Sequence, residues 1–320
     1  MKHRAFPRTG VAAFLLGGLA VASGAPPEWT VAEAGGQVEA RHGDSLVMAW
    51  QQQALARPTG GGKFAGSAFF HPLSTPSGFV WTSIQPADHL HHFGLWWPWK
   101  FIEVGGHRYN CWEIQEGQGA HRADSVKRLD SGPAKVVWEF KNSVEVRPQG
   151  AAPFTAIRET ATVTLAMHGA DGVALDLILD EQAAAEPVTI VAYRYSGFSW
   201  RGPLSWNKTN SQMLTSEGHD RDHANGQPAR WVVVTGPTPK GRASVLLMSA
   251  AEKPQEKLRV WDGSMSNGMP FVNFNPVVAK SLPLDAAHPE VAKRRYRVIA
   301  ADRKIDAADA ETEWKAWLVR

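Results

Sequence analysis

The sequence predicts an all-β fold, a two-sheet antiparallel sandwich that is followed by one C-terminal helix. Two observations lead to this prediction. Apolar and polar residues alternate with a period of two along most of the chain, and clusters of Gly, Pro, Asn and Asp separate the alternating runs. Many strands with turn signals between them and few helical patterns are typical of a sandwich.

The N-terminus has the pattern of a secretory signal peptide. Three basic residues precede an apolar run over residues 11–22, and Ala22-Ser23-Gly24 offers small residues for cleavage. The apolar run is too short for a membrane anchor, because spanning a bilayer takes about 20 apolar residues. We therefore expect residues 1–24 to be removed as a signal peptide, and the mature protein to be exported to the periplasm or the extracellular space.

Removal of the leader would leave a chain without excess charge. The whole sequence has 34 Lys and Arg against 31 Asp and Glu, and its first 24 residues hold three basic residues and no acidic one. The remainder is balanced, so it lacks the basic footprint of a nucleic-acid-binding protein. No later stretch is long and apolar enough to span a membrane. We expect residues 25–320 to form a single sandwich domain.

Period-two alternation predicts the individual strands. Over residues 173–179, one valine and three leucines share a face while Asp176 lies on the other, as in a half-buried strand. Similar runs are Ser45–Trp50, Gly78–Ile84, Lys135–Val146, Phe154–Met167, Val188–Tyr193, Arg230–Thr235, Ala243–Ser249 and Arg295–Ala300.

The end of the chain has a helical pattern instead. Asp306 is suited to cap the first turn, and Asp309 lies near the positive end of the helix dipole. Trp314, Trp317 and Leu318 follow at i, i+3 and i+4, which makes an apolar stripe. We expect this helix to pack against the sheets.

The densest group of chemically capable residues is rich in histidine. Four of the twelve histidines lie within residues 69–99, and three of these belong to the run Asp-His-Leu-His-His at 88–92. If this run is extended, His89 and His91 project from the same side, and His92 faces the other way. Two imidazoles so placed suit acid–base chemistry on one substrate.

Other roles for these histidines stay open. His89 and His91 could instead bind one divalent metal ion, although the sequence establishes no cofactor. Asp88 could orient a histidine through its ring N–H, as outer carboxylates do in metal sites. In the purely structural alternative, the imidazoles hydrogen-bond to the backbone at a strand end.

Tryptophans follow the histidine run closely, at Trp96, Trp97, Trp99 and Trp112. Adjacent residues of an extended segment alternate faces, so the first three cannot all point into one core. An indole has a broad apolar face and an N–H donor, which suits a sugar ring. We therefore predict that Trp97 or Trp99 forms a sugar platform beside His91.

Further polar residues complete the predicted site. Glu217, in a polar run, is a candidate general base or hydroxyl acceptor, with a solvated loop as the alternative. Asn273 and Asn275 share one strand face and could meet ligand hydroxyls, although Asn275, before Pro276, could instead shape a turn. His71, His92, Trp96 and Trp112 are further candidates for contact with the substrate.

These motifs resemble a bacterial family of unassigned function that is often labelled "methane oxygenase PmoA". The resemblance rests on His71-Pro72-Leu73, Asp88-His89-x-His91-His92-x-Gly94-Leu95-Trp96 and Asn110-x-Trp112, with weaker support at residues 216–218, 229–231, 271–276 and 295–298. A true methane monooxygenase subunit of this name is a bundle of membrane-spanning helices, which this chain lacks. The resemblance therefore implies a soluble sandwich of the broad galactose-mutarotase-like type.

The leading hypothesis is an exported carbohydrate-active enzyme that binds a small-molecule or oligosaccharide ligand. His89, His91 and an acidic partner, Asp88 or Glu217, would transfer protons in an epimerisation, a hydrolysis or an elimination. Hydrolysis would usually require two carboxylates at a defined separation, and the sequence does not identify such a pair. One alternative is a non-catalytic carbohydrate-binding protein, and the other is a His-ligated metalloprotein.

Overall fold

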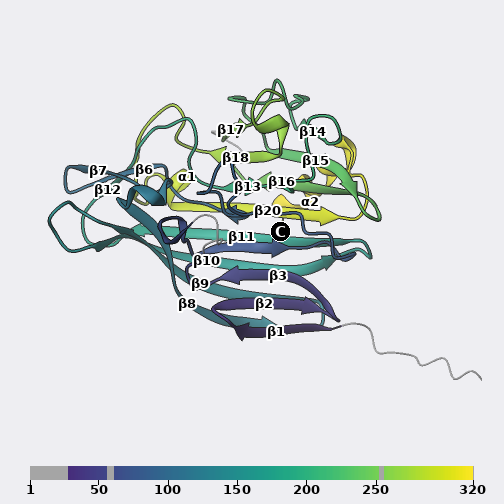
Figure 1. Cartoon of the computed structure of the whole chain (residues 1–320), viewed down its shortest axis with the longest axis horizontal. Helices are drawn as coiled ribbons and strands as arrows, with labels where there is room; N and C mark the ends of the chain where they lie inside the picture. Colours follow the sequence, from purple (N-terminus) through teal and green to yellow (C-terminus); the bar gives the residue numbers. More distant parts are fainter. Residues whose placement is uncertain (1–27, 56–60, 252–255, 320) are drawn as a thin grey trace, which may run out of the picture.

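Two large antiparallel sheets dominate the structure, a computed structural model that describes residues 28–55, 61–251 and 256–319 (Figure 1). The first sheet has eight strands. In spatial order they are β1 (Trp29–Ala34), β2 (Gln37–His42), β3 (Ser45–Gln51), β4 (Phe69–Leu73), β5 (Leu95–Trp96), β13 (Ser199–Arg201), β18 (Phe271–Asn275) and β17 (Lys257–Val260). The predicted signal peptide at residues 1–24 lies outside the described residues.

The second sheet also has eight strands, and a small third sheet lies at the left end of the view in Figure 1. The order in the second sheet is β14 (Gln212–Thr215), β15 (Trp231–Thr238), β16 (Gly241–Ser249), β20 (Lys293–Ala301), β11 (Gly172–Ala183), β10 (Phe154–His168), β9 (Lys135–Val146) and β8 (Gly119–Ser131). The third sheet comprises β19 (Leu282–Pro283), β12 (Val188–Ile190), β6 (Phe101–Val104) and β7 (His107–Asn110).

The main core lies between the two large sheets. Trp50 of β3 and Phe140 of β9 meet across it with ring centroids 4.6 Å apart. Both rings are almost fully buried. On β11 the predicted face of Val173, Leu175, Leu177 and Leu179 joins the same core. The predicted antiparallel sandwich is confirmed.

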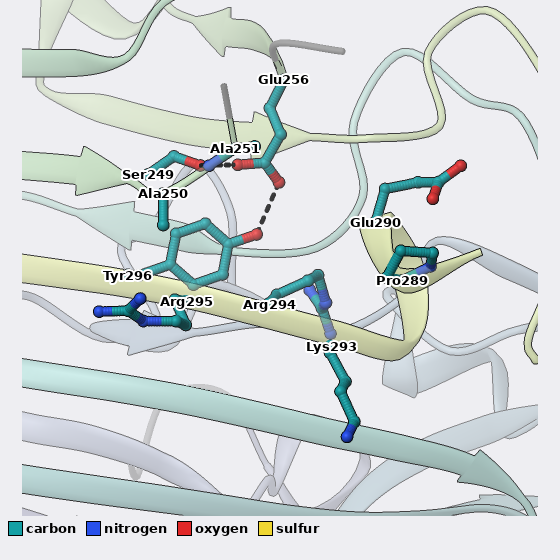
Figure 2. A pocket seen from close by; sticks show the side chains of 10 residues that line it. All are labelled: Ser249, Ala250, Ala251, Glu256, Pro289, Glu290, Lys293, Arg294, Arg295 and Tyr296. Atoms are coloured by element: carbon teal, nitrogen blue, oxygen red, sulfur yellow. Dashed lines mark hydrogen bonds between the residues drawn. The ribbon is translucent and has the colours of Figure 1, made fainter. Parts of the chain in front are cut away.

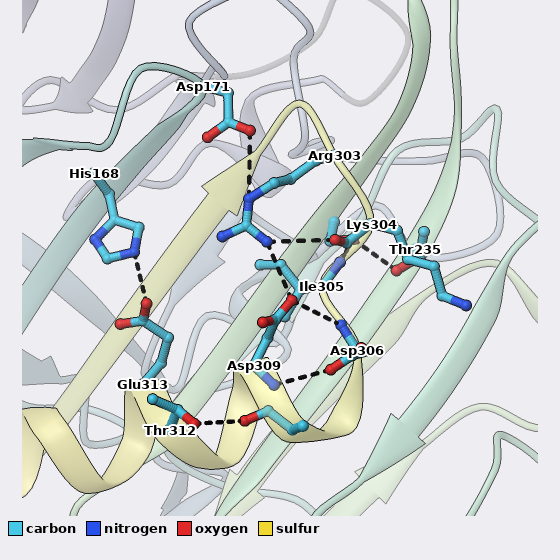
Figure 3. Close-up of polar contacts among 12 residues, drawn as sticks. His168, Asp171, Thr235, Arg303, Lys304, Ile305, Asp306, Asp309, Thr312 and Glu313 are labelled. Atoms are coloured by element: carbon cyan, nitrogen blue, oxygen red, sulfur yellow. Dashed lines mark hydrogen bonds and ion pairs between the residues drawn. The ribbon is translucent and has the colours of Figure 1, made fainter.

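The C-terminal helix is also confirmed. Helix α2 (Ala307–Leu318) begins with a capping box, in which the Asp306 side chain accepts from the backbone N–H of Asp309 at 2.9 Å (Figure 3). Trp314 and Trp317 are buried against the outer face of the second sheet. A hydrogen bond between the His168 ring and the Glu313 carboxylate, at 2.9 Å, also ties the helix to the end of β10.

Most of the predicted strands form, but Gly78–Ile84 does not. This segment makes only single bridges, Ser74 to Val80 and Ile84 to Phe93. Its Thr82 hydroxyl bonds the His71 ring and the Leu73 N–H, so side-chain contacts replace a continuous ladder. Strand β8 was not predicted, because it is an exposed edge strand whose many polar residues hide the alternation.

The connections between the strands contain little helix. The short helices are η1 (Gly62–Phe64), η2 (Ile114–Glu116), η3 (Ser266–Gly268) and α1 (Pro289–Ala292). Within the described ranges, no helix has the length and apolar character needed to cross a membrane.

Candidate functional site

Two cavities deserve comparison as ligand sites. One has a volume of about 410 Å³ and is lined by residues at the end of β16, at the start of β20 and in α1 (Figure 2). Its carboxylate Glu256 accepts hydrogen bonds from Ser249 and Tyr296, so this group is already satisfied within the protein. No histidine is among its described lining residues. We therefore place the candidate site in the second cavity, of about 120 Å³, which contains the histidine cluster.

The histidine run folds as consecutive turns, so the expected extended segment is wrong. The His89 N–H donates to the carbonyl of Pro86 at 2.9 Å, and the His92 N–H donates to the carbonyl of His89 at 3.1 Å. Gly94 then returns the chain to β5 with a φ of +52°. A Cβ at this position would lie 2.2 Å from the carbonyl oxygen of Phe70, so the turn requires glycine.

The turns bring all three imidazoles together. The ring centroids of His89 and His91 are 5.6 Å apart, and those of His89 and His92 are 4.7 Å apart. His91 and His92 are separated by 5.0 Å. The structure thus brings His89 and His91 to one cavity as expected, but His92 joins them instead of facing away.

Aromatic rings form the floor and the wall of this cavity. The buried His92 packs on Phe271, with centroids 4.9 Å apart, and on Trp96 at 5.2 Å. Trp261 lies 4.6 Å from the His89 ring, and Trp112 completes the wall. These rings are almost fully buried, so they exclude water from one side of the imidazoles and give the cavity an apolar border.

Asp88 is held beside His89 by a buried arginine. The Asp88 carboxylate accepts from Nη2 of Arg201 at 3.2 and 3.3 Å and from the hydroxyl of Ser266. Burial acts to raise the pKa of Asp88, but these two partners outweigh it and lower the pKa. Nδ1 of His89 lies 3.3 Å from the carboxylate. Asp88 is therefore ionised, with Arg201 as its charged partner and the His89 ring beside it.

Glu113 supplies the carboxylate inside the cavity, and the sequence interpretation missed it. It forms an ion pair with Lys100, and it accepts a hydrogen bond from the hydroxyl of Tyr195 at 2.8 Å. Burial acts to raise the pKa of Glu113, but these two donors lower it overall, so the group is ionised at neutral pH. In the sequence, only its position directly after Trp112 indicated that Glu113 could belong to the site.

Burial keeps the imidazoles uncharged. It lowers the pKa of His91 to about 4, against the opposing effect of the Glu113 carboxylate. Burial also lowers the pKa of His89 and places that of His92 well below its ordinary value. At neutral pH the cavity therefore presents neutral imidazoles, which accept protons, beside an ionised carboxylate.

The metal alternative finds no geometric support. Among the residues that the structure describes, no three His, Cys, Asp or Glu side chains are arranged to hold a metal ion. Neutral imidazoles at His89 and His91 would have the protonation state that ligation requires.

Two predicted platform residues lie in the core, so the hypothesis of a sugar platform at Trp97 or Trp99 is wrong. Each indole is about 1% exposed. The Trp97 N–H donates to the buried carboxylate of Glu159 and the Trp99 N–H to that of Glu181, both at 2.8 Å. The alternation argument held, because Trp96, Trp97 and Trp99 enter three different hydrophobic clusters. Of these three tryptophans, only Trp96 lies near the cavity, where it packs under the ring of His92.

Asn273 and Asn275 are structural, which corrects their predicted contact with a ligand. Both are almost fully buried. The Asn273 amide donates to the carbonyls of Ser196 and Phe198 at 2.9 and 3.1 Å. The Asn275 amide donates to the carbonyl of Tyr193 at 2.8 Å.

Two more predicted residues lie outside the cavity. Glu217 is exposed, and its carboxylate lies 3.6 Å from the guanidinium of Arg230, near α2. The polar loop was thus the correct alternative for this residue. His71 bonds Thr82 at 2.9 Å and is not among the residues that line the cavity.

Comparison with known proteins places the chain in a family without an assigned role. Residues 37–315 match the model of a family of unknown function (DUF6807). The sequence matches no curated protein. Among solved structures, the chain is similar to the GalM/aldose epimerase homologue from C. elegans, with 7% sequence identity and a TM-score of 0.32 over 85% of this chain and 98% of that one.

Proposed function

The chain belongs to this family of unknown function (DUF6807), and we propose from the geometry of the cavity that it is a carbohydrate-active enzyme and from its N-terminal sequence that it is exported. The observation that carries the proposal is the convergence of neutral imidazoles and an ionised carboxylate in one aromatic cavity. His91 exchanges a proton with the substrate, and Glu113 stabilises the imidazolium that forms. Asp88 holds His89 beside this pair.

His91 is the best placed of the three histidines for proton transfer. His92 is buried beneath the other rings, and His89 is the one closest to Asp88. His91 is partly exposed in the cavity, and Glu113 is the largest influence on its pKa after burial. A carboxylate that stabilises an imidazolium, without itself taking the proton, is the arrangement that assists a histidine base in serine hydrolases.

The lining supports a sugar as the ligand. Trp112, Trp261 and Tyr195 border the cavity with aromatic rings, which suit the C–H faces of a pyranose. The volume of about 120 Å³ is below the about 300–1,000 Å³ that is usual for drug-sized ligands, so we expect the site to hold a single ring or a terminal unit. We do not adopt the oxygenase label, because the lining residues offer proton transfer and stacking.

Binding without turnover is the remaining alternative, and a ligand screen distinguishes the two. We expect a monosaccharide or glycoside to raise the thermal midpoint of the full mature chain and to quench its tryptophan emission, since Trp112 and Trp261 border the cavity. The same compound should be converted, as followed by NMR. Binding without conversion would favour a carbohydrate-binding protein. If no sugar changes either signal, the proposal is wrong.

Export is a separate prediction, which rests on the N-terminal sequence. Expressed with its own leader in a bacterial host, the protein should be recovered outside the cytoplasm with its N-terminus near Ala25, as measured by intact mass. Ala22→Arg should block this cleavage, because the peptidase requires small residues at the site. Full-length protein retained in the membrane would contradict the prediction.

A further inference from the structure

We infer that the ligand of this cavity carries a carboxylate group, as a uronic acid does, and that Arg194 and Arg259 bind it. The inference rests on the proposed function and specifies its substrate class. Both arginines line the same cavity as His89, His91 and Glu113.

Neither guanidinium group is held in an ion pair with a carboxylate of the described residues, although Asp262 acts on Arg259 through its charge. Arg194 is exposed and lies over the Tyr195 ring, 5.6 Å from its centroid. Arg259 donates to the side-chain oxygen of Asn225 at 3.0 Å and contacts the sulfur of Met265.

The other charges of the site cancel in pairs. Glu113 is neutralised by Lys100, and Asp88 by Arg201. The imidazoles are uncharged at neutral pH, as argued above. A further acid, Asp262, accepts hydrogen bonds at the turn from Ser264 and Met265, stays ionised, and acts on Arg259 through its negative charge. Asp262 therefore offsets part of the positive charge of the two arginines, and the cavity keeps an excess of positive charge.

These two charges lie close enough to repel each other. Burial lowers the pKa of Arg259, the charge of Arg194 lowers it further, and the carboxylate of Asp262 acts in the opposite direction. Like charges that face one cavity and are only partly balanced raise the free energy of the empty site, and an anion that binds between them lowers this cost. The arrangement of the arginines therefore favours an anionic ligand over a neutral one.

A carboxylate fits better than a larger anion. A guanidinium pairs with a planar carboxylate through two parallel hydrogen bonds, which orients the ligand as well as attracting it. A uronic acid also has the ring face that Trp112 and Tyr195 can contact. Its carboxylate on the two arginines would leave the ring hydroxyls near His91.

The test compares acid and neutral forms of one sugar by calorimetry on the full mature chain. The binding of D-glucuronate and D-galacturonate is compared with that of their methyl esters. D-Glucose serves as a neutral sugar, and glucose 6-sulfate serves as a different anion. We expect a uronate to bind at least about tenfold more tightly than its ester, and its affinity to fall as salt is raised. Arg194→Gln and Arg259→Gln should each remove most of this preference, and Arg128→Gln, at an exposed strand position, should leave it intact.

The outcomes separate this inference from the proposed function. Equal binding of a uronate and its ester, with turnover, would overturn the carboxylate inference and leave the enzyme proposal standing. Stronger binding of the sulfate than of either uronate would likewise overturn it. If no sugar of the panel binds, both proposals fail. The thermal midpoints of the two arginine variants should equal that of the wild type, which shows that both fold normally. Arg194→Lys keeps the positive charge and so tests the charge separately from the two parallel hydrogen bonds of a guanidinium.

Discussion

Replacing His91 by asparagine is expected to lower kcat/KM at least about hundredfold on the substrate identified by the screen, with little loss of stability. Proton transfer by a positioned side chain contributes about 10²–10⁴-fold to rate. Asparagine keeps the polarity and much of the size of the ring but takes up no proton. His107→Asn is the matched control, because this histidine is exposed on β7.

The pH dependence of the same reaction tests the protonation state. The active form of His91 is the neutral imidazole, and its pKa is lowered to about 4. The value of kcat/KM should therefore be flat near neutral pH and fall as the pH drops through about 4. An acid limb near the ordinary histidine pKa of about 6.5, which the sequence alone suggests, would contradict the structure.

Glu113→Gln separates a positioning role from a purely structural one. The Glu113 carboxylate raises the pKa of His91, so its removal should shift the acid limb to lower pH as well as reduce the rate. A loss of rate without this shift would mean that Glu113 only supports the fold around Lys100 and Tyr195. A wild-type rate in His91→Asn would exclude His91 as the proton-transfer group.

Arg294→Met is expected to cost about 3–5 kcal/mol in the free energy of unfolding, because it breaks a buried ion pair. Arg294 on β20 lies 2.9 Å from Glu181 and stacks over Trp99, with its guanidinium 4.3 Å from the ring centroid. Burial and the neighbouring Glu159 raise the pKa of Glu181. Arg294 opposes this rise, so without the arginine Glu181 keeps the hydrogen bond from the Trp99 N–H but loses its cationic partner.

Urea denaturation of three variants measures this effect. Arg295→Met is the matched control, since Arg295 is the next residue of the same strand and is exposed, and it should lose less than about 1 kcal/mol. Arg294→Met combined with Glu181→Leu should recover part of the loss, because removing both partners costs less than leaving one unpaired. Equal stability of Arg294→Met and Arg295→Met would contradict the prediction.

The sequence by itself determined the architecture and the neighbourhood of the site. Alternation along residues 173–179 identified the core face of β11, and Asp306 with Asp309 identified the start of α2. These are local signals, because the period of side chains along a strand and the cap of a helix depend on residues a few positions apart. The run at 88–92 likewise marked the place where titratable side chains gather.

Only the tertiary structure decided which residues share the cavity. Arg194, Tyr195 and Arg259 lie far along the chain from His91, and no local pattern links them to it. The burial of Trp97 and Trp99 over two glutamates likewise depends on partners from other strands. Period two assigns a side chain to a face of its strand, but packing between distant segments determines whether that face meets the core or a ligand.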